Sequence, residues 1–209
     1  MNPPKISRIV VVVKENSTQA SEEAHKIIDK LVSFGFDIYT ISPFEHSSCT
    51  KVSSLKEVKR TRVQLVITIG GDGTILKVFR ELNDKTPILG VNVGGRGILT
   101  EITPKEFPKM LIKLENGDYF LDCRSRISCS VSSQVYPPAL NEIYLIRVPL
   151  NNTPTYTLNI GNSFTLSQRM DGIIVSSSTG STGHSLSLGG PVIDEKSDNF
   201  LFTPIGPVS

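Results

Sequence analysis

The pattern of apolar and polar positions in the first hundred residues indicates an alternation of strands and helices. Short runs of β-branched and aliphatic residues predict four strands, at 6–13, 36–41, 63–69 and 87–93. The runs at 6–13 and 63–69 are almost continuously apolar. This is typical of a strand that is covered on both faces of a parallel sheet.

Helical spacing of apolar residues follows two of these runs. Apolar side chains recur at helical intervals from 20 to 31 after Ser17, so we expect a helix there that Gly35 closes. A second helix is expected over 74–82. Strands that alternate with helices predict a Rossmann-like α/β domain, whose ligands bind at the carboxyl ends of its parallel strands.

The pattern changes after Thr103-Pro104-Lys105-Glu106, a capping box with proline at N1 that predicts a helix running to about Glu115. From 119 to 175, short stretches rich in Val, Ile, Ser, Thr and Tyr are broken by Pro, Asn and Gly, which predicts antiparallel β-structure. We therefore expect an α/β domain over 1–103 and an all-β domain over 104–209.

Composition excludes several classes of protein. The 209 residues are 38% hydrophobic and 20% charged, and a net charge of +2 predicts neither a nucleic-acid nor a membrane partner. No apolar run approaches the roughly 20 residues of a membrane span, and the first residues do not resemble a signal peptide. Cys49, Cys123 and Cys129 are odd in number and lack metal-ligand spacing, so we expect free thiols and a cytoplasmic location.

The segment that joins the third strand to the second helix is Gly70-Gly71-Asp72-Gly73-Thr74. Glycine permits positive φ and a close approach of backbone N–H groups to a polyanion, and a helix N-terminus favours phosphate. Gly70, Gly71, Gly73 and Thr74 are therefore predicted to bind phosphate.

Asp72 is unexpected among phosphate-binding glycines because a carboxylate repels phosphate. Three roles for it stay open: it accepts a proton from an attacking hydroxyl, it helps to hold Mg²⁺, or it only caps the helix. The sequence leaves the ligands of a metal unknown.

Four further polar segments are candidates for binding. Asn92-Val93-Gly94-Gly95-Arg96-Gly97 is a second glycine turn at a strand end, which could face the same pocket as the first. Basic residues between 42 and 62 could attract a polyphosphate, although a solvated helix face is the better interpretation.

Asn141 and Glu142 interrupt an apolar run, and an inward polar side chain needs a partner or a ligand; a bulge or edge is the simpler alternative. Residues 176–187 include eight hydroxyl side chains, which could bond sugar hydroxyls and amides.

These segments together resemble the NAD kinase family, from about residue 65 to 207. The family has a Gly-Gly-Asp-Gly turn, an Asn-x-Gly-x-x-Gly turn, an Asn-Glu pair, and an Asp-Gly strand that leads into a hydroxyl-rich loop ending in Gly-Gly-Pro. This chain has all four in the same order, at 70–73, 92–97, 141–142 and 171–191. Diacylglycerol and sphingosine kinases and phosphofructokinases share only the first, so a lipid kinase is the alternative.

The resemblance implies transfer of a phosphoryl group from ATP, or from polyphosphate, to the 2′-hydroxyl of the adenosine ribose of NAD, which gives NADP. It implies that Mg²⁺ arrives with the donor, that NAD binds between the two domains, and that Asp72 accepts the proton. We also expect a homodimer or homotetramer. The NAD contacts that the resemblance implies are Asp72, Gly73, Lys77, Asn141, Glu142, Arg169, Asp171, Thr182, Gly183, His184, Ser185, Leu186 and Ser187.

The chain departs from the family pattern in three places. His184 stands where the family usually has tyrosine and Gly183 where it has alanine, and Ser177-Ser178 replaces Thr-Pro. The family segment that matches 203–207 normally continues into further strands, so we expect an incomplete β domain at Ser209. A non-catalytic nucleotide-binding fragment is therefore a second alternative.

Overall fold

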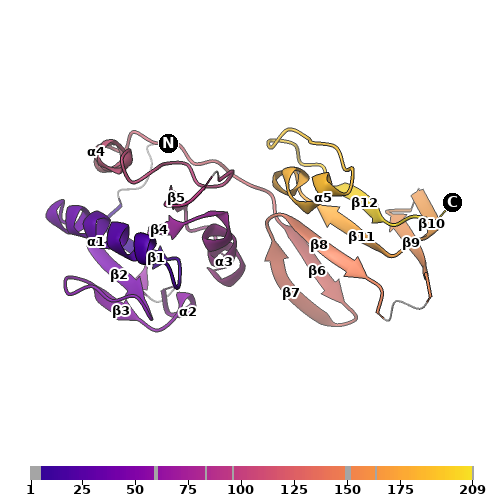
Figure 1. Ribbon diagram of the computed structural model, residues 1–209, viewed down its shortest axis with the longest axis horizontal. Coiled ribbons are helices and arrows are strands. Elements are labelled where there is room, and N and C mark those ends of the chain that lie inside the picture. Colours follow the sequence, from indigo (N-terminus) through magenta and orange to yellow (C-terminus); the bar gives the residue numbers. More distant parts are fainter. Residues whose placement is uncertain are drawn as a thin grey trace. The chain divides into compact units, whose positions relative to one another are not determined.

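The chain folds into two compact units, Met1–Asp122 and Cys123–Ser209 (Figure 1). The computed structural model describes residues 6–58, 61–82, 84–95, 97–148, 152–162 and 164–208. Each unit is described by itself.

The first unit is built on a five-stranded parallel sheet with strand order β3-β2-β1-β4-β5 (Figure 1). Its strands are β1 (Arg8–Val13), β2 (Asp37–Ile41), β3 (Thr50–Val52), β4 (Leu65–Gly70) and β5 (Ile88–Asn92). Its α-helices are α1 (Thr18–Ser33), α2 (Leu55–Val58), α3 (Asp72–Leu82) and α4 (Phe107–Asn116). The predicted parallel sheet is confirmed, and the chain reverses its winding direction between β1 and β4, where such folds bind ligands.

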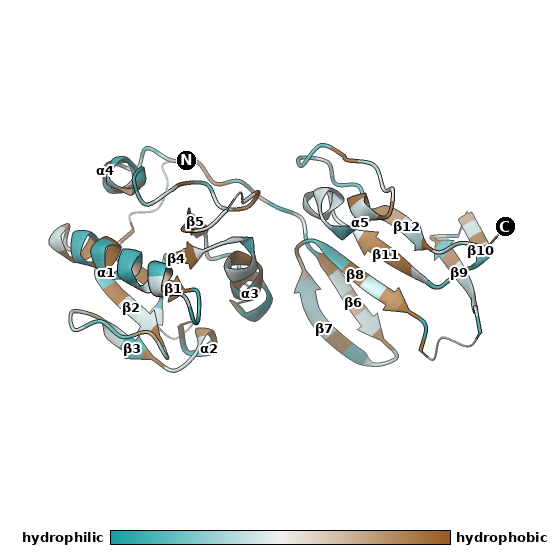
Figure 2. Cartoon of the chain, in the orientation of Figure 1, coloured by the Kyte–Doolittle hydropathy of each residue, from teal (hydrophilic) through white to brown (hydrophobic). Residues whose placement is uncertain are grey.

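Residues of opposite parity along the strands face opposite layers of this sheet. Ile9 and Val11 pack with α1 and α4, whereas Val10 and Val12 pack with α2 and α3. All six residues of β4 are buried, which confirms that this strand is covered on both faces. Figure 2 shows the resulting apolar strands between helices with polar outer faces.

The predicted helix ends are confirmed for α1 and partly for α4. The Ser17 hydroxyl accepts the N–H of Ala20 at 3.3 Å, and Gly35 has a φ of +82° just after the helix. At the second helix, the Glu106 carboxylate accepts the N–H of Thr103 at 2.8 Å, as a capping box requires. Regular α-helix nevertheless begins at Phe107, because the residues between form a turn.

Helix α4 belongs to the first unit. Phe107, Leu111 and Leu114 are buried in the core that α1 also covers. The division between the units accordingly lies after Asp122 rather than after residue 103, where the change in sequence pattern placed it. A pattern change marks the first residue with a new periodicity, whereas packing decides which core an amphipathic helix joins.

The second unit consists of small antiparallel sheets, which confirms the predicted β-structure. Strands β12-β11-β8 form one sheet, β10-β9 a second and β6-β7 a third. The strands are β6 (Ile127–Val131), β7 (Gln134–Ala139), β8 (Glu142–Ile146), β9 (Thr155–Ile160), β10 (Phe164–Arg169), β11 (Gly172–Ser176) and β12 (Leu201–Ile205). A 3₁₀ helix, η2 (Thr179–Thr182), and α5 (His184–Ser187) follow β11.

Two expectations from composition concern the whole chain. Cys49, Cys123 and Cys129 are free, as predicted. Within the described ranges, no helix has the length and apolar character that crossing a membrane requires.

Candidate functional site

The Gly-Gly-Asp-Gly turn joins the end of β4 at Gly70 to the start of α3 at Asp72. A side chain at Gly70 would collide with the Thr74 hydroxyl, so this position requires glycine for close approach. Gly71 and Gly73 have no atom within 4 Å of where a Cβ would lie, so their backbone faces open space. None of the three is among the positive-φ glycines of the described residues, so the turn uses the small size of glycine and not its left-handed conformation.

The Asp72 carboxylate binds backbone N–H groups of the residues just after the second glycine turn. Oδ2 accepts the N–H of Ile98 at 2.8 Å, and Oδ1 accepts those of Leu99 and Thr100 at 3.1 and 3.2 Å. These donors lie outside α3, so capping of its own helix is not the role of this side chain. Since each carboxylate oxygen accepts about two bonds, Oδ2 keeps one acceptor position for a further donor.

The second glycine turn is shaped to reach Asp72. Asn92 orders it, because its side-chain Nδ2 donates to the Gly95 carbonyl at 2.7 Å and its Oδ1 accepts the Gly94 N–H at 2.9 Å. A Cβ on Gly97 would lie 2.8 Å from Asp72 Oδ1 and would collide with the Thr100 hydroxyl. The two glycine turns therefore lie close together, and a pocket shared by both stays a prediction; Arg96 lies outside the described residues.

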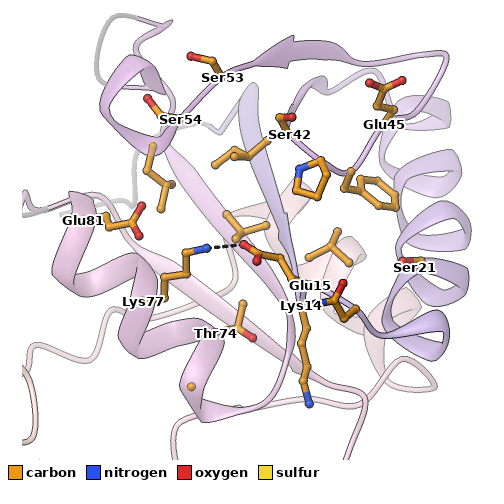
Figure 3. Close-up of a pocket in the computed structure, with 18 of the residues that line it drawn as sticks. Lys14, Glu15, Ser21, Ser42, Glu45, Ser53, Ser54, Thr74, Lys77 and Glu81 are labelled. Carbon is orange, nitrogen blue, oxygen red and sulfur yellow. Dashed lines mark hydrogen bonds and ion pairs between the residues drawn. The ribbon is translucent and has the colours of Figure 1, made fainter.

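A cavity of about 730 Å³ opens at the carboxyl edge of the sheet, beside the same turn (Figure 3). We call it the edge cavity. Its wall includes Gly71, Gly73 and Thr74 from the predicted phosphate-binding set, and segments that follow β1, β2 and β3 complete it. It therefore lies where a doubly wound sheet is expected to bind a ligand.

Lys77 contacts an acid in this cavity. Its Nζ lies 2.6 Å from Glu15 Oε1, and Figure 3 shows the two side chains reaching toward one another from α3 and from the turn after β1. The hydrogen bond and the charge of Lys77 lower the pKa of Glu15, and the hydrogen bond to Glu15 raises the pKa of Lys77. Both side chains are about half exposed, so the pair is weak enough for a polyanion to displace.

The basic segment 42–62 contributes little positive charge to the cavity. Lys51 forms an ion pair with Glu45, and it is Glu45 that lines the wall. Lys59 and Arg60 lie outside the described residues. The segment forms β3 and the four-residue α2 instead of one solvated helix.

Asn141 and Glu142 lie at the start of β8 in the second unit. Within the described part of the chain, Asn141 Oδ1 and Glu142 Oε2 are buried and have no hydrogen-bond partner. A Cβ on Gly183 would lie 2.9 Å from Glu142 Oε2, and one on Gly180 would collide with the Asn141 carbonyl. Both side chains therefore have a buried acceptor atom, and β8 is also an edge strand of its sheet, as the simpler alternative had it.

An aromatic pair flanks these acceptors. The rings of Tyr144 and His184 are 5.5 Å apart between centroids and inclined at 41°. The Tyr144 hydroxyl donates to Glu142 Oε1 at 3.0 Å. Sequence reasoning missed Tyr144, although its place two residues after Glu142 on one strand put both on the same face.

Most hydroxyls of the loop 176–187 form hydrogen bonds within the second unit, so fewer of them are left for a sugar than the composition indicated. Ser177 donates to the Leu140 carbonyl, Ser178 to that of Glu195, and Ser185 bonds the Thr203 hydroxyl at 2.7 Å. Serine side chains this close to buried carbonyls satisfy the backbone first. In the segment 182–187, the exposed residues are His184, Leu186 and Ser187.

The remaining predicted contacts lie at the end of β10 and the start of β11. Arg169 is exposed, and its carbonyl accepts the N–H of Val208. The Asp171 carboxylate forms an ion pair with Arg147, with 2.8 Å between Oδ1 and Nε. Thr182 is half-buried, and its hydroxyl donates to the Thr179 carbonyl at 3.3 Å.

Comparison with known proteins decides the family. The model of the ATP-NAD kinase N-terminal domain matches residues 9–119, and that of the ATP-NAD kinase C-terminal domain matches residues 140–209. The chain belongs to the ATP-NAD kinase family. The NAD kinase of Thermococcus sibiricus is 32% identical, over 95% of this chain and 72% of its own length. The NAD kinase of Pyrococcus abyssi is 30% identical, over 96% of this chain and 73% of its own length.

Solved structures agree with this kinase family. Yeast NADH kinase complexed with NADH has a TM-score of 0.85, over 98% of this chain and 64% of the yeast chain. The sequences are 24% identical, so this likeness supports the fold alone. An NAD kinase from Archaeoglobus fulgidus in complex with ATP has a TM-score of 0.72 at 26% identity, over 97% of this chain and 73% of its own. The lipid-kinase alternative is not favoured.

Proposed function

We propose that this NAD kinase family member phosphorylates NAD, with ATP as the donor. In the transfer, the 2′-oxygen of the adenosine ribose forms a bond to the γ-phosphorus, the bond from that phosphorus to the β–γ bridging oxygen breaks, and ADP leaves. The proton of the 2′-hydroxyl must be accepted. The observation that carries the proposal is the Asp72 carboxylate, held by three N–H groups with one acceptor position left on Oδ2.

Asp72 acts as the proton acceptor through that remaining position on Oδ2. Phosphoryl transfer has a loose transition state, so the hydroxyl loses its proton late and the help of a base is modest. The main task of the residues around it is therefore to hold the two reacting groups in place.

The donor phosphates bind in the edge cavity. Open backbone at Gly71 and Gly73, the N-terminus of α3 and the Lys77 ammonium all favour an anion there, and Gly70 lets the turn close on Thr74. The related NAD kinase from Archaeoglobus fulgidus is in complex with ATP, which favours ATP over polyphosphate as the donor here.

Mg²⁺ enters as part of the donor. Among residues 6–208 that the structure describes, no group of three or more His, Cys, Asp or Glu side chains could hold a metal ion. Mg²⁺ usually keeps waters and substrate phosphates as ligands, so a dedicated protein cage is not needed.

NAD binds through residues of the second unit. The buried acceptors Asn141 Oδ1 and Glu142 Oε2 suit the hydroxyl and amino donors of a nucleoside, and the exposed His184 ring offers a flat face. Leu186 and Ser187 contact NAD directly, whereas Thr182, Gly183 and Ser185 shape the loop. The proposed contacts also include Arg169, the Asp171–Arg147 pair, Gly73 and Lys77.

Location and assembly are part of the same proposal. Three free cysteines agree with a reducing cytoplasm. Exposed apolar side chains in the second unit, among them Leu145 and Ile146 on β8, support a homodimer or homotetramer.

The test is incubation with NAD, ATP and Mg²⁺, followed by detection of NADP with an NADP-specific dehydrogenase. We expect NADP to accumulate in proportion to protein and time. Calorimetric binding of NAD without turnover would instead identify a nucleotide-binding module. Phosphorylation of diacylglycerol or sphingosine in micelles, with NAD unchanged, would show a lipid kinase.

A further inference from the structure

The two oxygens of the Glu142 carboxylate have different surroundings. Oε1 accepts the Tyr144 hydroxyl at 3.0 Å, whereas Oε2 is buried and has no partner among the described residues. A carboxylate that rotates freely exchanges its oxygens. The hydrogen bond from Tyr144 therefore fixes which oxygen stays available and where it points.

The backbone places the two side chains for this contact. Glu142 and Tyr144 are two residues apart on β8, opposite Ser176 and Ile174 of β11, so they emerge from the same face of the sheet. Gly183 leaves room for the free oxygen, since a Cβ there would lie 2.9 Å from Oε2. The available acceptor thus lies in a space that has no side chain from position 183.

We propose that Tyr144 is a positioning residue for NAD binding: its hydroxyl orients Glu142, so that Oε2 accepts a hydrogen bond from the nucleoside. This inference deepens the proposed function and rests on it. Tyr144 does not take part in the chemical step. It sets the affinity for the acceptor substrate through the carboxylate next to it.

The surroundings keep the Tyr144 hydroxyl a donor. Partial desolvation, the hydrogen bond to Glu142 and the negative charge of that carboxylate raise the pKa of Tyr144 to about 12. The phenol therefore stays protonated in any ordinary assay, and Glu142 keeps the orientation of its carboxylate.

The ring of Tyr144 has a separable role. It lies against His184, with 5.5 Å between centroids, and this contact does not need the hydroxyl. Tyr144→Phe consequently removes the bond to Glu142 and keeps the ring. A matched control is Tyr136→Phe on β7, which removes a tyrosine hydroxyl from an exposed side chain of the same unit.

The experiment measures NAD binding by calorimetry and steady-state kinetics on the whole chain. For Tyr144→Phe we expect the Kd and KM for NAD to rise about three- to tenfold, the size of one hydrogen bond, with kcat within about twofold of the parent. Tyr136→Phe should leave all three constants unchanged. A merely structural role would instead lower Tm and kcat without a selective effect on KM.

A double-mutant cycle tests that Tyr144 acts through Glu142. Glu142→Ala alone should weaken NAD binding, and adding Tyr144→Phe to it should change Kd by less than about twofold. The inference is overturned if either Tyr144→Phe or Glu142→Ala binds NAD with the Kd of the parent. It is also overturned if Tyr144→Phe raises this Kd by the same factor in the Glu142→Ala protein as in the parent.

The same measurements separate this inference from the proposed function. If the parent makes no NADP but Tyr144→Phe weakens NAD binding, the positioning role holds and the kinase assignment fails. If the parent makes NADP and Tyr144→Phe does not affect its KM, the assignment holds and the positioning role fails.

Discussion

At the scale of single residues, the central finding is the environment of Asp72. Three N–H donors converge on one carboxylate, and charge-assisted bonds of this kind hold an anion firmly. The same bonds define the position of the oxygen that stays available. In the proposed function, positioning and proton acceptance therefore depend on this one side chain.

Asp72→Asn should lower kcat by about 10²- to 10⁴-fold, the usual value of general-base help. The amide also turns one acceptor into a donor that faces backbone N–H groups, so Tm should fall. The KM for NAD should change much less than kcat. The measurement is kcat across a Mg²⁺ series: loss at every concentration supports the base, whereas full rescue at high metal identifies a metal ligand.

At the scale of elements, the site depends on how two loops meet at the end of neighbouring strands. Gly70 of β4 pairs in register with Asn92 of β5, so the turns that follow them start side by side. The first supplies the Asp72 carboxylate, and the residues just after the second supply the N–H groups that bind it. Glycine at position 97 lets the loops come this close.

Gly97→Ala should lower kcat nearly as much as a change of Asp72 itself, because the new methyl group would push the second loop away from the carboxylate. Gly95→Ala is the matched control, since nothing lies within 4 Å of its Cβ position. The comparison is kcat and Tm of both variants. Equal activity of the two would show that the contact between the loops is dispensable.

Glu15→Gln should lower the KM for ATP. The change removes the carboxylate that binds Lys77 across the edge cavity and frees the ammonium for phosphate. The pair is exposed and screened by salt, so we expect only about a two- to fivefold effect, which should shrink as ionic strength rises. Glu45→Gln is the control, because Glu45 lines the same wall but pairs with Lys51 and not with Lys77. A rise in KM would mean that Glu15 itself helps to bind the donor.

At the scale of the whole molecule, two units contribute different parts of the proposed chemistry. The first has the Gly-Gly-Asp-Gly turn and the edge cavity, and its packed core includes α4. The second has the unpaired acceptors of Asn141 and Glu142. Each unit is compact by itself, so damage to one core should be felt first within that unit.

Phe107→Ala should destabilise the first unit by about 3–5 kcal/mol, because Phe107 is fully buried and its loss leaves a cavity. Amide exchange should accelerate in β1, β4 and β5 and stay unchanged in β8, β11 and β12. Ile112→Ala, on an exposed position of the same helix, should have little effect. Faster exchange in both units alike would show that they unfold together.

Most of the elements of the first unit and the family could be predicted from the sequence. Apolar runs and helical spacing depend on neighbours only a few residues away, so the strands β1, β2, β4 and β5, the Ser17 cap and the Gly35 stop were predictable. The glycine turns and the Asn-Glu pair were visible for the same reason. Their order along the chain was enough to indicate an NAD kinase.

Which groups meet depends on long-range packing, which the sequence pattern does not show. Asp72 binds an N–H 26 residues further on, and Lys77 binds an acid 62 residues earlier, because the strand order brings these loops to one edge. The hydroxyls of the loop after β11 turned inward since nearby buried carbonyls competed for them. The ring of Tyr144 on β8 meets that of His184 on α5. Local spacing cannot express such contacts, which depend on how distant segments pack.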